Sequence, residues 1–126
     1  MMQVKGLIKN KTREIVTLEA DKSVEDAIRL MHSKKISAII ITEKGETTGI
    51  FTERDVVRCY VAKDGKKKFK EIPLKEAMTT NLITAKPDDN VGDIMSIMVE
   101  NSIRHLPVVE DGKVVGMLSI RDVIGL

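Results

Sequence analysis

The sequence predicts an α/β (α+β) fold built from two β-α-β-β-α repeats. Three observations predict it: the chain matches itself at an offset of 67 residues, two apolar stripes have helical spacing, and β-branched runs end at glycine-containing turns. Two copies of one unit usually occur when neither copy buries its apolar face alone. We therefore expect the repeats to pack about a pseudo-two-fold axis.

The repeat aligns residues 16–57 with residues 83–124 without a gap. We expect a first repeat over 1–62, including an N-terminal segment, a linker over 63–73, and a second repeat over 74–126. Most aligned pairs keep their apolar or polar character. The identical pairs are Thr17/Thr84, Asp21/Asp88, Val24/Val91, Asp26/Asp93, Met31/Met98, Ile36/Ile103, Glu43/Glu110, Gly45/Gly112, Gly49/Gly116, Arg54/Arg121, Asp55/Asp122 and Val56/Val123.

The first repeat opens with a packing segment, a strand and a helix. Three apolar residues at helical spacing predict a short packing segment within residues 1–11, and weak alternation predicts a strand over 14–18. Apolar residues then recur at spacings of 3, 4 and 7. This stripe predicts an amphipathic helix over 23–34, capped by Asp21 or Ser23.

A hairpin and a second helix complete the first repeat. The continuous β-branched run over 36–41 is typical of a strand buried on both faces. Gly45 supplies a positive φ for the turn, and residues 47–51 return as the next strand. Thr52 then caps a helix that runs to about residue 62.

The lysine-rich residues 63–70 break the periodicity. A basic patch for phosphate or nucleic acid is one interpretation, but a solvated linker is favoured because no aromatic residue except Phe69 lies among the lysines. Pro73 starts a short helical turn over 74–78. The second repeat then predicts a strand over 82–85, a helix over 91–101, a strand over 105–109, a turn at 111–112, a strand over 114–118 and a helix from 120 onward.

The composition limits the class of protein. A chain of 126 residues with 42% apolar residues is enough for one compact domain, or for two small ones sharing a core. The net charge of +2 by itself implies neither nucleic acid nor an acidic membrane as a partner. A single cysteine, Cys59, excludes an internal disulfide, and there is no signal-like segment or run of ~20 apolar residues. We expect a soluble, cytoplasmic protein with no membrane span.

The duplicated turn is the strongest functional signal. Thr52-Glu53-Arg54-Asp55 recurs as Ser119-Ile120-Arg121-Asp122, each time where a strand passes into a helix. Helix N-terminal N–H groups bind phosphate, and an aspartate accepts both hydroxyls of a ribose. Arg54 and Arg121 add a positive charge that a simple helix cap does not need. The turn therefore predicts a nucleoside phosphate site.

A purely structural explanation of the same turns stays open. Thr52 and Ser119 are good N-caps, and Asp55 and Asp122 fall at the third helical position, so each turn is also a capping box. Gly49 and Gly116, which open the apolar runs before the turns, have two interpretations as well: close approach of a ligand, or a role within the strand.

The chain closely resembles a tandem pair of CBS domains (cystathionine-β-synthase domains, a Bateman module). The resemblance rests on the repeat, on the glycine–apolar–apolar–Thr/Ser-x-Arg-Asp motif, and on Ile103-Arg104-His105-Leu106-Pro107-Val108-Val109 followed by Asp111-Gly112-Lys113. It covers residues 4–126, and its motifs are specific as a set. It implies a stand-alone module with two clefts for adenosyl ligands, each built from pieces of both repeats.

The resemblance also assigns residues to the two clefts. One cleft would hold Asp122 and Ser119 with Thr17, Ile36, Ser37 and Ala38. The other would hold Asp55, Thr52 and Arg54 with Thr84, Ile103, Arg104 and His105, and its cationic side chains favour it for polyphosphate. The first cleft departs from the Arg-His-Leu-Pro pattern. This argues against phosphate there, while a ribose can still dock on Asp122.

Related modules commonly form homodimers through their helices, so we expect a homodimer here. The stripe residues Ile28, Met31, Met95 and Met98 are candidates for that contact or for the core. His32 and His105 have no Cys or His partner at metal-ligand spacing, and Cys59 has no paired histidine nearby. We therefore predict no metal site, no catalytic cofactor and no enzyme activity.

The leading hypothesis is a regulatory module that senses AMP, ADP or ATP and passes its state to a partner protein. NAD(H) and S-adenosylmethionine carry the same ribose, so the sequence does not select among these ligands. A structural dimerisation or interaction module with empty clefts is the alternative. Nucleic-acid binding through Lys66 to Lys70 is a weaker third one. The sequence names neither the regulated partner nor its pathway.

Overall fold

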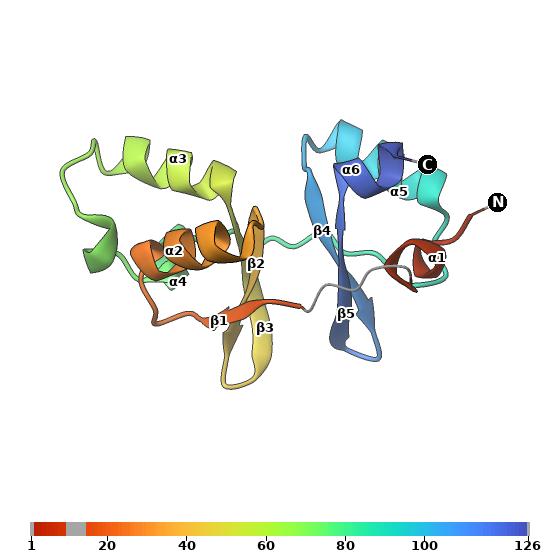
Figure 1. Ribbon diagram of the computed structural model, residues 1–126, viewed down its shortest axis with the longest axis horizontal. Coiled ribbons are helices and arrows are strands. Elements are labelled where there is room, and N and C mark those ends of the chain that lie inside the picture. Colours follow the sequence, from red (N-terminus) through yellow and green to blue (C-terminus); the bar gives the residue numbers. More distant parts are fainter. Residues whose placement is uncertain (1, 10–14, 126) are drawn as a thin grey trace. The chain divides into compact units, whose positions relative to one another are not determined.

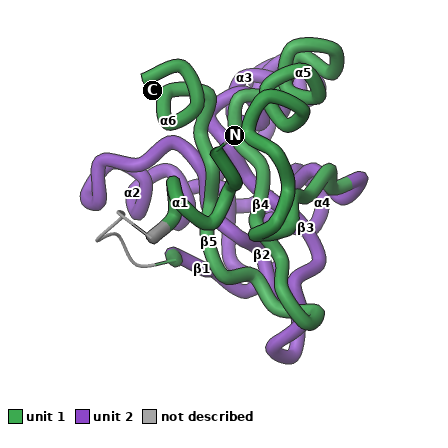
Figure 2. The backbone as a smooth tube through the Cα atoms, turned by 90° about the vertical axis from the view of Figure 1, so that its right-hand side faces the viewer, with its two compact units in different colours: residues 1–15, 82–126 green, residues 16–81 purple. Residues whose placement is uncertain are grey.

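The computed structural model of the protein describes residues 2–9 and 15–125, which form two compact units. Unit 2 comprises Val16–Asn81, and unit 1 comprises Met1–Ile15 together with Leu82–Leu126 (Figure 2). Each unit combines helices with strands, which confirms the mixed α/β class (Figure 1).

Unit 2 has a three-stranded sheet in the order β1-β2-β3, with β1 parallel to β2 and β2 antiparallel to β3. Its helices gather on one side of that sheet (Figure 1). The elements are β1 (Thr17–Glu19), α2 (Val24–Lys34), β2 (Ala38–Glu43), β3 (Glu46–Thr52), α3 (Glu53–Ala62), the short 3₁₀ helix η1 (Phe69–Glu71) and α4 (Leu74–Ala77).

Local sequence explains why α2 begins and ends where it does. Ser23 and Asp26 form a capping box, in which each side chain accepts from the other residue's backbone N–H at 3.0 Å. The helix ends at Lys35, which has a left-handed φ of 55°. Its predicted apolar stripe is confirmed, because Ala27 and Met31 pack into the core formed with β2 and β3.

Unit 1 repeats this plan with a two-stranded antiparallel sheet of β4 and β5. Its elements are α1 (Val4–Lys9), α5 (Val91–Glu100), β4 (His105–Glu110), β5 (Lys113–Ser119) and α6 (Ile120–Ile124). The hairpin turns match between units, since Gly45 and Gly112 have φ of 81° and 77° as predicted. The core of unit 1 includes Met98 and Leu106.

The predicted strand over 82–85 is wrong. Only Ala85 forms a bridge there, to Val108, through Ala85 N donating to the Pro107 carbonyl at 2.9 Å and Val109 N donating to the Ala85 carbonyl at 2.8 Å. In unit 2 the residue aligned with Pro107 is Ile40, and its N–H donates to the Val16 carbonyl. Pro107 has no N–H to donate, so the second copy loses that ladder bond and its first strand is not formed.

The short helix before each repeat belongs to the unit that holds the other repeat: α1 precedes the repeat of unit 2 but packs in unit 1, and α4 precedes the repeat of unit 1 but packs in unit 2. In unit 2, Val24 N donates to the Ile72 carbonyl and Leu74 N donates to the Lys22 carbonyl, at 2.8 and 2.7 Å. In unit 1, Val91 N donates to the Met2 carbonyl and Val4 N to the Asp89 carbonyl, at 3.0 and 2.9 Å. The pairs correspond, so α1 holds in unit 1 the place that α4 holds in unit 2.

The element boundaries otherwise shift by a few residues. The strand predicted over 14–18 corresponds to β1, and the strand predicted over 36–41 corresponds to β2. Residue 14 of the first predicted strand lies outside the described residues, and so do residues 1, 10 and 11 of the predicted packing segment. The predicted division at 62 and 74 follows the sequence repeat and stays a prediction. Ile72, inside the predicted linker, is fully buried in the core of unit 2.

Candidate functional site

The first turn joins β3 to α3 and carries a buried carboxylate. Asp55 is 1% exposed. One of its oxygens, Oδ2, accepts from the backbone N–H of Thr52 at 2.9 Å and from the Thr52 hydroxyl at 3.3 Å. This part of the predicted capping box is confirmed.

The other oxygen of Asp55 is engaged by two residues outside the turn motif. Oδ1 accepts from the Thr79 hydroxyl at 2.9 Å and lies 3.1 Å from Nη1 of Arg58. Sequence reasoning missed both partners. Arg58 was detectable, because it stands three residues after Asp55 on one helix face. Thr79 gave no signal, since it lies 24 residues away.

The second turn joins β5 to α6 and leaves its carboxylate more open. Asp122 Oδ2 accepts from the Ser119 backbone N–H and from the Ser119 hydroxyl, both at 2.8 Å, and the carboxylate is half-buried. The repeat aligns Arg58 with Gly125, which has no side chain. The second turn therefore carries no arginine at the position that Arg58 occupies in the first.

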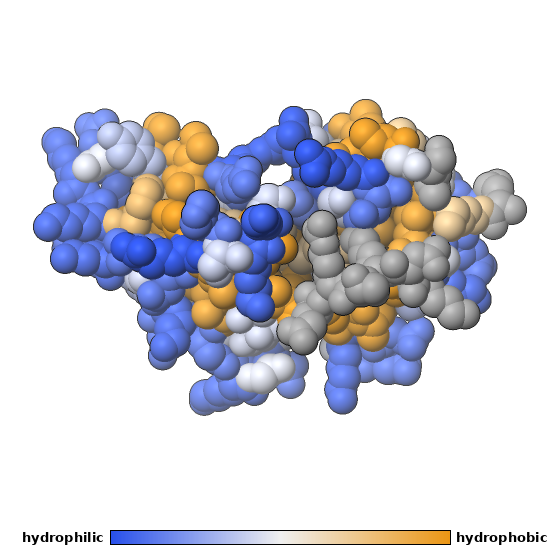
Figure 3. All heavy atoms as spheres, in the orientation of Figure 1, coloured by the Kyte–Doolittle hydropathy of each residue, from blue (hydrophilic) through white to orange (hydrophobic). Residues whose placement is uncertain are grey.

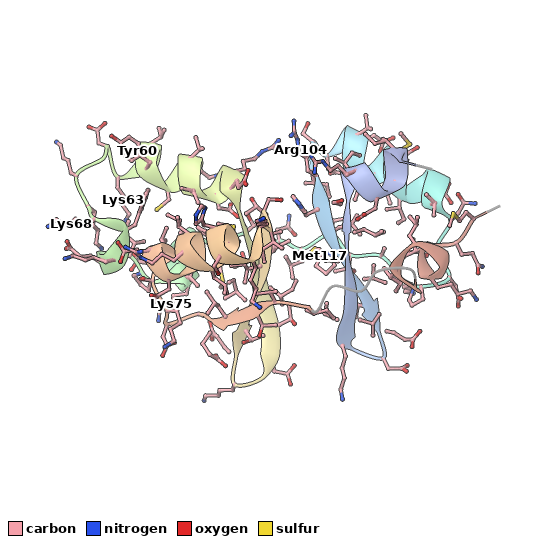
Figure 4. The ribbon with its side chains drawn as sticks, viewed as in Figure 1. Tyr60, Lys63, Lys68, Lys75, Arg104 and Met117 are labelled. Carbon is pink, nitrogen blue, oxygen red and sulfur yellow. The ribbon has the colours of Figure 1, made fainter. Side chains whose placement is uncertain are left out.

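Each turn lies beside the start of the neighbouring strand in its own unit. Glu53 N donates to the Ser37 carbonyl at 3.2 Å, and Ala38 pairs with Thr52. In unit 1, Ile120 N donates to the Arg104 carbonyl at 2.8 Å, and His105 pairs with Ser119. Arg104 is exposed directly before the start of β4 (Figure 4). Each unit thus brings together its own set of predicted residues. The set in unit 2 is Ser37, Ala38, Thr52 and Asp55, and the set in unit 1 is Arg104, His105, Ser119 and Asp122.

The remaining predicted site residues fall into three groups. Ile36 and Ile103 are half-buried and pack against the two cores. Thr17, on β1 opposite Ile40, and Thr84 are exposed. Arg54 and Arg121 are exposed in the first turns of α3 and α6. Each predicted cleft combines residues of both units, and this grouping stays a prediction.

Both strand glycines have a packing role. A Cβ on Gly49 would lie 2.6 Å from the sulfur of Met78 and 3.0 Å from the Thr79 carbonyl oxygen. A Cβ on Gly116 would lie 2.9 Å from Cγ2 of Ile8. Of the two interpretations open from the sequence, close packing within each unit explains both glycines.

Other candidate chemistry is limited. Within residues 2–9 and 15–125, no group of three or more His, Cys, Asp or Glu side chains is placed to hold a metal ion, and no helix is long and apolar enough to cross a bilayer. Burial raises the pKa of the Cys59 thiol. An open depression of about 460 Å³ on unit 2 lies between Leu18, Lys22, Asp26, Arg29, Leu30 and Ser33, which include none of the predicted site residues.

Solved structures with this fold include proteins of the predicted family. A putative signal-transduction protein with CBS domains from Burkholderia ambifaria superposes with a TM-score of 0.91 at 33% identity, covering 98% of this chain and 91% of that one. The CBS domain pair of protein MJ0100, in complex with 5′-methylthioadenosine and S-adenosyl-L-methionine, superposes with a TM-score of 0.83 at 25% identity, covering 98% and 94%.

Sequence comparison agrees with the fold. The mitochondrial CBS domain-containing protein CBSX3 of Arabidopsis thaliana is 34% identical over 107 residues, which are 82% of this chain. The chain spans about half, 52%, of that relative's length. The sequence profile of the CBS domain matches residues 4–62 and 74–126, one match in each repeat. The predicted resemblance is confirmed, and the chain belongs to the CBS domain family.

Proposed function

We propose that the chain is a non-enzymatic regulatory module that binds an adenine nucleotide (AMP, ADP or ATP) and passes the ligand state to a partner protein. The observation that carries the proposal is the half-buried carboxylate of Asp122 in the duplicated turn, beside the exposed Arg104. The MJ0100 domain pair, a family member of similar fold, binds two adenosyl compounds.

Asp122 is the proposed ribose acceptor. Its carboxylate is half-buried, and Oδ2 accepts from the backbone N–H and the hydroxyl of Ser119. The resemblance assigns Arg104 and His105 to the other cleft, but His105 lies in register with Ser119, so we propose that Arg104 and Arg121 supply the cationic groups for a phosphate here. The cleft predicted for this aspartate also draws on Thr17, Ile36, Ser37 and Ala38. The cytoplasmic location stays a prediction.

Asp55 is a weaker candidate for a ribose. Both of its oxygens already accept bonds, and accepting a ribose would require the release of Thr79 or Arg58. The sequence favoured its cleft, with Thr52, Arg54, Thr84 and Ile103, for polyphosphate. We propose instead that the Asp122 cleft is the primary site.

Calorimetric titration of the full chain with AMP, ADP and ATP tests this assignment. Asp122→Asn keeps the shape of the side chain but removes the charge that accepts the ribose hydroxyls, so affinity should fall by about tenfold or more. Asp55→Asn is the matched control in the equivalent turn and should bind as the unaltered chain does. The reverse pattern would transfer the ribose role to Asp55.

Homodimerisation is a second proposal with its own observation. Large apolar side chains are exposed on α3, where Val57 and Val61 are 65% and 69% exposed, and on α5 and α6, where Val99 and Ile124 are 66% and 59% exposed (Figure 3). Of the stripe residues, Met31 and Met98 belong to the cores and Ile28 packs against one, while Met95 is 38% exposed.

Light scattering after gel filtration measures the oligomeric state of the chain. We expect a dimer for the unaltered chain and a monomer for Val57→Asp combined with Val61→Asp, because two charges would enter an apolar contact. A dimer that survives both changes would show that this face is not the interface.

A further inference from the structure

The positive charge of the chain is concentrated in one segment. Five of the 21 Lys and Arg residues, but only one of the 19 Asp and Glu residues, lie in residues 63–70, here called the lysine loop. The loop therefore carries a charge of +4, and the rest of the chain carries −2, against a total of +2. The small net charge conceals a strongly basic surface.

Backbone bonds hold the first half of the loop in a defined conformation. Gly65 N donates to the Tyr60 carbonyl, and Asp64 N and Lys66 N donate to the Val61 and Lys63 carbonyls, all at 3.0 Å. Gly65 has a φ of 66°, and a Cβ there would lie 2.7 Å from the hydroxyl oxygen of Tyr60. The loop thus closes tightly against the end of α3, which a flexible linker would not do.

An aromatic contact anchors the second half. Phe69 packs against the core of unit 2, and its ring meets that of Tyr60 edge to face, with centroids 6.4 Å apart. Tyr60 remains 58% exposed. Figure 4 shows Tyr60, Lys63 and Lys68 at the end of unit 2 where α3 passes into the loop. The lysines are therefore presented from a backbone fixed at both ends.

Four of the lysines have no acidic partner in the described part of the chain. Lys63 lies 3.7 Å from Glu76, but Lys66, Lys67, Lys68 and Lys70 are exposed and form no ion pair there. Grouped like charges repel one another and raise the local potential, which attracts an anionic partner. Glu76 offsets only the charge of Lys63 among the described residues of unit 2.

We propose that the lysine loop and Tyr60 form a docking surface for an acidic segment of a partner protein. A protein segment fits better than nucleic acid, because Tyr60 is one exposed aromatic ring, whereas single-stranded nucleic acid is bound by several aromatic side chains that stack successive bases. Carboxylates pair with the lysines, and the exposed face of Tyr60 accepts an apolar side chain of the segment.

This inference deepens the proposed function, because a regulatory module needs a surface for the protein that it regulates. The docking surface includes none of the residues proposed to bind the nucleotide. Docking and nucleotide binding are therefore separable by experiment.

Fluorescence anisotropy with the full chain tests the docking surface without nucleotide. The probe is a labelled peptide of about twelve residues, made of Asp and Glu around one central Leu, because such a segment spans the loop. A single-stranded oligothymidine of about the same length is the second probe. We expect the peptide to bind more tightly than the oligonucleotide.

A matched pair of variants separates the loop from net charge. Lys66→Gln, Lys67→Gln and Lys68→Gln together should weaken peptide binding by about tenfold or more. Lys34→Gln, Lys86→Gln and Lys113→Gln, all at exposed lysines elsewhere, remove the same charge and should change affinity by less than about twofold. Tyr60→Ala should also weaken binding.

Three results would overturn the proposal: no binding of the peptide, an equal loss in both triple variants, or tighter binding of the oligonucleotide. The last result would indicate a nucleic-acid surface. Asp122→Asn should bind the peptide as the unaltered chain does. Loss of nucleotide binding with peptide binding intact would therefore contradict only the proposed ribose site, and the converse only the docking surface.

Discussion

Two aligned aspartates have different surroundings. Asp55 and Asp122 both accept the backbone N–H of the hydroxyl residue that caps their helix. Only Asp55 also binds Thr79 and Arg58, and only Asp55 is fully buried. The same motif is therefore a structural anchor in unit 2 and a candidate ligand site in unit 1.

Stability should differ between the two aspartates. Asp55→Ala leaves the Thr79 hydroxyl and Thr52 N–H without their buried acceptor, so we expect it to cost about 2–3 kcal/mol. Asp122→Ala removes a half-buried cap and should cost about 0.5–2 kcal/mol. Urea denaturation of both variants measures which of them loses more free energy of unfolding. A larger loss for Asp122→Ala would contradict the anchoring role of Asp55.

The capping box of α2 predicts a pH effect. The backbone N–H of Ser23 donates to the carboxylate of Asp26 and holds the pKa of that carboxyl below its ordinary value of 3.8. The charged form stabilises the fold, so this contribution is present above pH 3.8 and is lost as the pH falls through the lowered pKa.

NMR titration of the Asp26 side chain measures that pKa. Ser23→Gly keeps the backbone donor and should leave the pKa low, whereas Asp26→Asn should remove this part of the acid dependence of stability. An Asp26 pKa at or above the ordinary value in the folded chain would contradict the capping box.

At residue scale, local signals were predictable and distant ones were not. The caps at Ser23, Thr52 and Ser119 follow from residue type and position. The burial of Asp55 depends on Thr79, which a later segment brings to the turn, and nothing near Thr79 in sequence indicates that contact.

At the scale of elements, the leading helices α1 and α4 hold corresponding places. Leu74 and Val4 are both fully buried, and each lies in the first turn of its helix. Leu74 belongs to the core of unit 2 and Val4 to the core of unit 1. Each leading segment is thus part of the core on which it packs.

Truncation of these anchors should act locally. Leu74→Ala should cost about 2–5 kcal/mol and reduce hydrogen-exchange protection in β3 and α2. Val4→Ala should reduce protection in α5, β4 and β5 instead. Lys75→Ala, on an exposed neighbour, is the control and should change little. If either change reduced protection equally in both units, the assignment of α4 to the core of unit 2 and of α1 to the core of unit 1 would be contradicted.

Elements were predictable where a periodic pattern or a turn residue marks them, as in α2, α5 and the two hairpins. The strand at 82–85 was predicted wrongly, because its apolar pattern is present but Pro107 removes one ladder bond. The place of α1 was not predictable either. Its helical spacing predicts packing, but only contacts to residues 87–91 decide which unit receives it.

At the scale of the whole chain, the repeat carried most of the prediction. The resemblance to the family rested on the repeat at an offset of 67 residues together with the motifs that it carries. The repeat also identified both turns of the candidate site. Only part of the difference between the turns was predictable: Arg58 and the aligned Gly125 can be found in the sequence, whereas the Thr79 contact and the burial of each carboxylate cannot.

The most direct test of the central claim is thermal melting of the full chain with AMP, ADP, ATP, NADH and S-adenosylmethionine at millimolar concentration. A ligand at ~100 times its Kd adds about 2.7 kcal/mol, which raises the Tm by several degrees. We predict a rise with an adenine nucleotide that Asp122→Asn abolishes and Asp55→Asn retains. No rise with any of these ligands would contradict the ligand-binding role and favour a structural interaction module.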